Sequence, residues 1–487
     1  MSSDRAYPPL RVVIRCADSV QARVRYVFDT LFMARGVPVE YTDAPPSEGA
    51  WVLYAPSKDT SLPLDRCVAI ANRPDAWGLF DGDSDVESTD EANGLAAIFP
   101  QTDLAFAGPS DIPFDLVANA FYFLSSWSER KRAVGSGSRQ LCTTSIFARL
   151  GIPQDIVDRY LERLSTALAS LRGGQGAPYE SCFGWPSEAS FVIVLSHDVD
   201  FLPSGLFDNV LQGGKSLLRH LVRQRDPVDA LRAAAGLLKS LLAGRDPYGC
   251  VPEIIAEETR RGVRSSFQVA VARRHPADVN YDIRDDRTRD YLRAITHAGF
   301  DLCLHGSYRS TEQRSWYVEE AALLEERLER PIGSRQHFLS FEYDALFAAQ
   351  EEAGIQYDMS MGFPDRTGPR AGFSYPYFPF CLAENRPYDV VEISLFFMDV
   401  TLRGYMGLRP QRAREVIESG LKDLQRKRGA VSVVWHPIVF GGARDPGYDR
   451  LYWDLVDLVK AMGGLATDGR TINDFWRERA RSYTSFS

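Results

Sequence analysis

Paired cysteines are missing from this sequence of 487 residues, whose seven cysteines are scattered and never form a Cys-x-x-Cys motif. An odd number of separated thiols argues against a disulfide framework and a cysteine zinc site, and it favours a reducing compartment. No apolar run approaches the roughly 18 residues of a membrane-spanning helix. Residues 1–9 are polar and hold no apolar core of an export signal. These absences predict a cytoplasmic protein with no membrane span.

A block of basic residues is also missing, because 56 Lys and Arg stand against 65 Asp and Glu and the formal net charge is −9. Nucleic acid is therefore not an expected partner. The chain has no Gly-x-Gly-x-x-Gly fingerprint and no phosphate-binding loop. What is present is an ordinary globular composition, with 45% hydrophobic and 25% charged residues and enough length for two domains. Nothing in the sequence predicts the oligomeric state.

A small α/β domain is predicted over residues 1–140 from its apolar spacing. The predicted elements are strands at 10–15 and 51–54 and helices at 19–35 and 114–127. A Gly-Ser-Gly-Ser run within 133–139 and a glycine-rich stretch at 173–178 have the composition of flexible linkers. Residues 141–185 are therefore interpreted as a linker that carries one helix, at 153–171.

From residue 251 onward, a helix, a capping glycine and a strand follow one another repeatedly, which is typical of parallel α/β architecture. The predicted strands lie at 191–195, 265–271, 300–304, 333–337, 355–359, 389–395, 430–435 and 464–466. This count favours a distorted or incomplete (β/α) barrel over residues 186–487. The excursion at about 203–250 is predicted to be a helical insertion near the mouth of the barrel. It is interpreted either as a lid that selects the substrate or as a packing decoration.

Polar residues stand at the ends of several predicted strands. Four of the seven histidines are placed there, namely His197, His305, His337 and His436. Asp198 and Asp200 follow the first strand of the barrel, whose carboxyl edge is where ligands bind in such folds. One such histidine alone is more often a satisfied core or surface residue, and a short Asp-x-Asp run is common in loops. Taken together, these residues favour a metal site.

The chemistry of this set is specific. Two imidazoles and a carboxylate on neighbouring strand ends suit Zn²⁺, and also Fe²⁺, Co²⁺ or Ni²⁺. A second carboxylate beside the metal can act as general base on water, and a histidine across the site can act as general acid. An arginine close to that carboxylate would keep it ionised. A divalent metal ion, with Zn²⁺ as first choice, is therefore the predicted cofactor.

Five short segments carry a family resemblance. They are 195–200 (LSHDVD), 304–308 (LHGSY), 335–339 (RQHFL), 369–372 (PRAG) and 434–437 (VWHP). In this order they resemble the motifs of polysaccharide deacetylases (NodB homology, carbohydrate esterase family 4), and most of all a divergent branch with an extra N-terminal domain. The resemblance implies a distorted (β/α) barrel in which a divalent metal activates water to remove an N- or O-acetyl group from a sugar. Carbohydrate is thus the expected substrate.

The same resemblance implies catalytic roles. Asp198 matches the catalytic base, and Arg335 matches the arginine that orients this base. His436 matches the general acid that protonates the leaving group, and Asp358 matches an acid that supports this histidine.

The implied metal ligands depart from the family pattern. Asp200 matches the metal carboxylate, although Val199 separates it from Asp198 where the family has adjacent acids. His305 matches the first metal histidine, but Arg309 stands four residues later, where the family has the second. Because arginine cannot bind a metal, His337 at the next strand end is expected to replace that ligand. The candidates for substrate binding are Arg370, Ser307 and Arg309.

Three functions follow from the sequence. The first is a metal-dependent deacetylase of an N- or O-acetylated sugar or sugar intermediate, with a role in surface-polysaccharide biosynthesis. The second is a hydrolase of another carbon–nitrogen amide bond, with a pocket reshaped by the insertion. The third is a catalytically silent carbohydrate-binding protein, a hypothesis that is motivated by Arg309 at the ligand position.

Overall fold

The computed structural model describes most of the chain between residues 9 and 483. The described ranges are 9–59, 61–131, 141–171, 184–202, 206–218, 221–222, 227–242 and 250–483. The predicted linkers at 133–139 and 173–178 lie outside these ranges, as do parts of the predicted insertion at 203–250. Within the described ranges, none of the helices has the length and apolar character needed to cross a membrane.

The first described residues form a four-stranded parallel sheet in the order β2-β1-β3-β4. Its strands are β1 (Leu10–Ile14), β2 (Val39–Tyr41), β3 (Trp51–Ala55) and β4 (Cys67–Ala71). The helices that share its core are α1 (Asp18–Met33), α3 (Leu116–Leu124) and α6 (Ile156–Ser170). The strands and helices predicted for this part of the chain are confirmed, because each is a run of apolar residues with clear strand or helix spacing.

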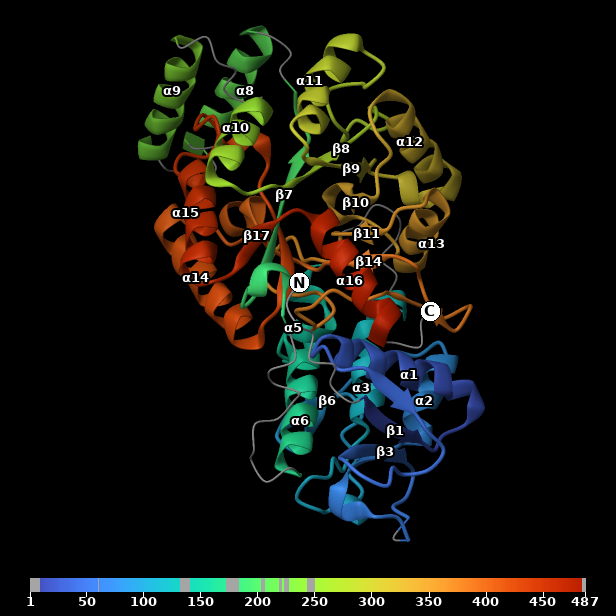
Figure 1. Cartoon of the computed structure of the whole chain (residues 1–487). Helices are drawn as coiled ribbons and strands as arrows, with labels where there is room; N and C mark the ends of the chain where they lie inside the picture. The colour runs from blue at the N-terminus through green and yellow to red at the C-terminus, as the bar shows by residue number, and fades with distance from the viewer. Residues whose placement is uncertain are drawn as a thin grey trace.

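The larger part of the chain forms a nine-stranded parallel sheet that curls into a partial barrel (Figure 1). Eight strands follow the order β14-β11-β10-β9-β8-β7-β16-β15, and β17 pairs with the start of β7. They are β7 (Val192–Val199), β8 (Ser266–Val269), β9 (Asp301–Gly306), β10 (Gly333–Gln336), β11 (Tyr357–Asp358), β14 (Val391–Glu392), β15 (Leu395–Met398), β16 (Ala430–Val434) and β17 (Leu465–Thr467). Within the described residues β14 and β15 do not pair, so the barrel is distorted and incomplete, as predicted.

From residue 250 to residue 483, all of which the structure describes, seven α-helices alternate with the strands. They are α10 (Val251–Arg261), α11 (Asp286–His297), α12 (Arg314–Arg327), α13 (Tyr343–Ala353), α14 (Pro410–Lys427), α15 (Tyr448–Ala461) and α16 (Gly469–Tyr483). Their amphipathic spacing explains the packing, since α14 buries Ile417, Leu421 and Leu424 along one face. Gly262 and Gly354 end α10 and α13 in the left-handed conformation that glycine adopts without strain.

The strand β7 determines where the site forms. All eight of its residues are buried, which explains the continuous apolar run at its start. It lies between β16 on one side and β8 and β17 on the other, all parallel to it. Parallel pairing continues through β9 to β10, so the carboxyl ends of these strands meet at one edge of the sheet. The polar residues that end these strands are thereby brought together.

The N-terminal sheet is joined to the barrel by apolar and polar contacts. The largest hydrophobic cluster contains residues of both the N-terminal sheet region and the barrel. It includes Phe28 of α1, Tyr357 of β11 and Trp476 of α16. Arg370 of the barrel donates two hydrogen bonds to Glu129, at 2.8 and 2.7 Å, and both side chains are largely buried. A separate domain over residues 1–140 therefore stays a prediction.

The Glu129–Arg370 pair provides a stability test. The substitution Glu129→Ala leaves a buried guanidinium without its carboxylate, and we expect a loss of about 3–5 kcal/mol in unfolding free energy. The matched control is Glu40→Ala, which breaks the exposed pair between Glu40 and Arg11 and should cost no more than about 1 kcal/mol. Urea unfolding followed by tryptophan fluorescence measures both. Equal losses of stability in the two variants would contradict a stabilising role for the Glu129–Arg370 pair.

Candidate active site

The acidic end of β7 presents its side chains alternately to opposite sides. His197 points away from the barrel interior, since its Nδ1 lies 2.6 Å from the carbonyl oxygen of Trp435 and its Nε2 lies 3.0 Å from Glu258. Ser196 and Asp198, on either side of it, both accept hydrogen bonds from Arg335. Of the four histidines expected at strand ends, His197 is therefore outside the site.

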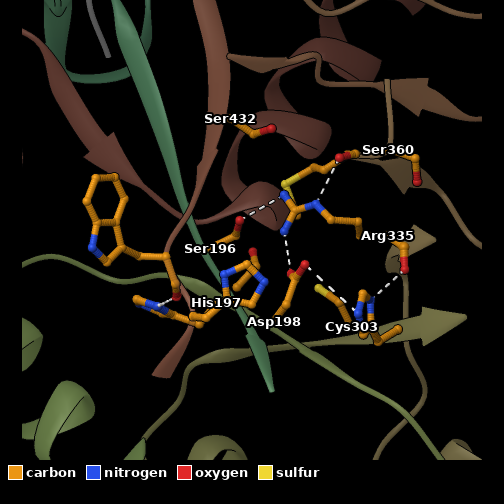
Figure 2. A network of polar contacts seen from close by, with 12 residues as sticks. Ser196, His197, Asp198, Cys303, Arg335, Ser360 and Ser432 are labelled. Atoms are coloured by element: carbon orange, nitrogen blue, oxygen red, sulfur yellow. Dashed lines mark hydrogen bonds and ion pairs between the residues drawn. The ribbon is translucent and has the colours of Figure 1, made fainter. Parts of the chain in front are cut away.

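Asp198 is held by a buried arginine. Arg335 Nη1 lies 2.5 Å from Asp198 Oδ1, and Nη2 donates to Ser196 Oγ at 2.8 Å (Figure 2). The Nε of Arg335 donates to the carbonyl oxygen of Met359 at 2.9 Å, which fixes the guanidinium plane. Burial alone raises the pKa of Asp198, but the charge of Arg335, followed by those of the nearby histidines, outweighs it and holds the pKa below its ordinary value. Asp198 is thus a carboxylate at neutral pH.

Three side chains from successive parts of the sheet converge beside Asp198. Asp200 Oδ1 lies 3.2 Å from Nε2 of His305 and 3.7 Å from Nε2 of His337. The three candidate ligand atoms all lie within 4.8 Å of one another. Two ligands at metal bonds of about 2.1 Å in a tetrahedral site stand about 3.4 Å apart, so this spacing fits one cation.

Two buried polar atoms of the cluster have no hydrogen-bond partner among the residues that the structure describes, which also supports a shared cation. Asp200 Oδ1 and His305 Nε2 are both buried, and neither makes a hydrogen bond of good geometry within the described residues. Buried polar atoms without partners are costly, and a shared cation would satisfy both. The donor set of two imidazoles and one carboxylate suits a catalytic zinc site and related divalent metals. Asp200, His305 and His337 therefore fit a divalent metal.

Each candidate histidine ligand is oriented through its other ring nitrogen. His305 Nδ1 lies 2.9 Å from the carbonyl oxygen of Arg335, and His337 Nδ1 lies 3.3 Å from Asp278 Oδ1. Asp278 also accepts hydrogen bonds from the backbone of Tyr308 and His275, so its position is fixed. Such outer contacts orient metal ligands. Asp278 was not predicted from the sequence, because an acid in the loop between β8 and α11 belongs to no recognisable motif.

The backbone beside His337 is strained. Phe338 and Leu339 have φ of 60° and 55°, in the left-handed region that such residues rarely adopt. Strained backbone of this kind is concentrated at functional sites, where the surrounding structure holds it in place. Here the strain accompanies a turn that directs His337 toward Asp200.

His436 faces the cluster from the opposite side. Its Nε2 lies 3.6 Å from Asp200 Oδ2, and its Nδ1 lies 2.7 Å from Asp399 Oδ1. Asp399 also accepts the backbone N–H of His436 at 3.0 Å. Burial lowers the pKa of His436, but Asp399 and then Asp200 and Asp198 outweigh it and raise the pKa to about 9. His436 is thus an imidazolium at neutral pH and can donate a proton.

Asp399, and not Asp358, is the acid beside His436. Asp358 lies elsewhere in the sheet and accepts hydrogen bonds from Ser334, Gln350 and Ser360. The prediction of Asp358 as the supporting acid was wrong because it came from the order of motifs alone. Asp399 stands at the carboxyl end of β15, the strand next to β16, and this placement was the available signal.

The three candidate substrate-binding residues lie outside the cluster. Ser307 donates to Glu320 through its backbone and its hydroxyl. Arg309 is half exposed and pairs with Glu312 at 3.3 Å. Arg370 is engaged by Glu129, as described above. His337 offers the ligand nitrogen that Arg309 cannot. The hypothesis of a catalytically silent protein, which was based on Arg309, is therefore weakened.

Comparisons with known proteins do not assign a family. No family model and no curated protein matches the sequence. Among solved structures, the chain is similar to a Mycobacterium smegmatis protein assigned as a polysaccharide deacetylase, with 18% sequence identity and a TM-score of 0.41. The match covers 61% of this chain and 93% of that chain. A likeness at this level carries no functional conclusion for this chain.

The metal site predicts a clear pattern of ligand substitutions. His305→Ala and His337→Ala should each abolish stoichiometric binding of Zn²⁺, because two protein ligands are too few for a stable site. Asp278→Asn should weaken binding by about 10–100-fold by releasing the ring of His337. Arg309→Ala is the control and should bind as the parent protein does. Titration calorimetry with Zn²⁺ measures all four, and full binding by His337→Ala would contradict the assignment.

The ion pair of His436 predicts its titration in the metal-free protein. We expect NMR titration of this imidazole to give a pKa of about 9. Asp399→Asn removes the negative charge that favours the imidazolium, and it should lower the pKa by about one unit or more. Asp358→Asn is the control and should leave the pKa of His436 unchanged. A pKa near the ordinary value in the parent protein would contradict the geometry.

Proposed function

We propose that the protein is a metal-dependent hydrolase that removes an acetyl group from an acetylated sugar or sugar intermediate. One observation carries the proposal: Asp200 lies within 3.7 Å of three histidines while Asp198, two residues away, is held as a carboxylate by Arg335. A candidate cation site, a base and a proton donor thus stand at one place, which is the set that hydrolysis of an amide or ester needs.

The metal and the base have separate tasks. Asp200, His305 and His337 would hold a divalent cation, which when bound would supply Lewis acidity for the acyl oxygen and for water. Asp198 accepts the proton of the attacking water, because its lowered pKa leaves it ionised and Arg335 fixes its direction. Its second oxygen, Oδ2, lies 3.9 Å from His305 Nε2, so the base faces the candidate cation site.

His436 completes the reaction as proton donor. Cleavage of the acyl bond leaves an amine or alkoxide that must take up a proton, and the Nε2–H of His436 can supply it. Asp399 binds the other ring nitrogen at 2.7 Å and stabilises the charged imidazole before the transfer. Water is consumed, and acetate and the free amine or alcohol leave.

The choice of an acetylated sugar rests on the resemblance of the five ordered segments to polysaccharide deacetylase motifs. The side chains of the cluster would be equally suited to the hydrolysis of another amide bond. Zn²⁺ as the metal, a place in surface-polysaccharide biosynthesis and a cytoplasmic location belong to the same proposal.

Acetate release from N-acetylglucosamine oligomers tests the proposal. Asp198→Asn should lower kcat by about 10²–10⁴-fold, since the amide cannot accept the proton, while Zn²⁺ content stays unchanged. Arg309→Ala is the control and should keep parent activity. Parent activity in Asp198→Asn would remove this residue from the chemistry. Acetate release from simple acetylated amines without release from the sugars would replace the deacetylase with a hydrolase of other amides.

A further inference from the structure

Exposed apolar side chains are concentrated in the insertion that follows Asp200. Of the eleven exposed large hydrophobic residues in the described ranges, eight lie on α8 (Leu206–Leu218), on α9 (Pro227–Leu242) or on residues 221–222 between them. They are Leu211, Leu218, Leu221, Val222, Val228, Leu231, Leu238 and Leu242. Exposed apolar side chains gathered on two helices that contact each other mark an interaction surface, whereas single exposed apolar residues do not. We call it the α8–α9 surface.

The helix α9 is apolar on two faces. Its inner face carries the buried Ala230 and Ala233 and also Gly236, where an added Cβ would come within 2.7 Å of the carbonyl oxygen of Gly442. Small residues therefore allow α9 to pack closely against the barrel. The outer face carries Leu231 and Leu238, seven residues apart and thus on one stripe, and they are 73% and 59% exposed. The outer leucines are not needed for packing on the barrel.

The helices of the α8–α9 surface are linked through the chain to residues of the candidate active site. They follow Asp200 in the chain, and Ser216 of α8 donates to the carbonyl oxygens of Ala443 and Arg444. These two carbonyls belong to the segment that follows His436. The contact therefore joins the segment after Asp200 to the segment after His436. In Figure 1, α8 and α9 lie at the end of the molecule opposite the N-terminal sheet.

The insertion is basic in an acidic protein. Residues 206–242 contain six Lys and Arg and three Asp, which gives a net charge of 6 − 3 = +3, whereas the whole chain has −9. Lys215 and Lys239 are exposed on the two helices. Leucines flanked by lysine and arginine are typical of helices that lie in the interface of anionic membranes.

We propose that the α8–α9 surface docks peripherally onto an anionic lipid bilayer. The leucines enter the headgroup region, and the basic residues meet the lipid phosphates. A second copy of the chain fits less well, because a two-fold interface would bring the exposed Lys215, Arg232 and Lys239 of the two copies together. Docking in this way brings the two helices that follow Asp200 in the chain to the membrane surface.

Vesicle sedimentation of the full-length protein tests the proposal. The protein should bind vesicles of phosphatidylcholine with phosphatidylglycerol, bind pure phosphatidylcholine at least about tenfold more weakly, and lose affinity as salt rises. The double substitution L231E/L238E should lower binding to the mixed vesicles at least about tenfold. The matched control is Leu104→Glu, at a residue that is 89% exposed on the N-terminal part, and it should bind as the parent protein does.

Two further measurements separate the outcomes. His305→Ala should keep parent vesicle binding, so failure of the proposed hydrolase and failure of membrane docking are distinguishable. Circular dichroism checks that L231E/L238E is folded, which its exposed positions predict. Absence of binding to either vesicle overturns the proposal. Dimerisation in analytical ultracentrifugation that is lost in L231E/L238E, without vesicle binding, assigns the surface to a second copy and also overturns it.

Discussion

The ion pair of Arg335 and Asp198 is the constraint on which the rest of the site depends. A buried carboxylate stays ionised at neutral pH only if a fixed positive charge or several donors compensate the loss of water. Arg335 does this from β10, which is separated from β7 by β8 and β9. Its own carbonyl also orients His305, so one residue directs both the proton acceptor and a candidate metal ligand. Curling of the sheet makes this reach possible.

Much of the fold and part of the site follow from the sequence. Strands such as β7 and β16 are rich in valine and isoleucine, and helices such as α14 have strong apolar periodicity, so packing enforces what the pattern predicts. His305, His337 and His436 were correctly expected to converge, since parallel strands place their carboxyl ends together. The sequence alone could not show that the side chain of His197 points away from the site. Its direction depends on where β7 ends, and the strand continues to Val199.

The supporting acids could not be predicted in the same way. Asp278 and Asp399 act through contacts between segments that are far apart in the chain, and such contacts leave no local periodicity. His337 shows how a neighbouring strand end can supply a ligand that Arg309 cannot. The exchange is possible because β9 and β10 are adjacent and parallel, so their ends approach the same point. The α8–α9 surface follows Asp200 in the chain, so the membrane docking proposed for it would bring the chemistry proposed for the barrel to a lipid surface.

The central claim is that Asp200, His305 and His337 hold one divalent cation beside Asp198. Anomalous diffraction from crystals of the zinc-loaded protein tests this claim most directly. The account predicts one strong peak at about 2.0–2.2 Å from Asp200, from Nε2 of His305 and from Nε2 of His337. A zinc peak bound by other residues, or no peak at this cluster at full zinc loading, would contradict it.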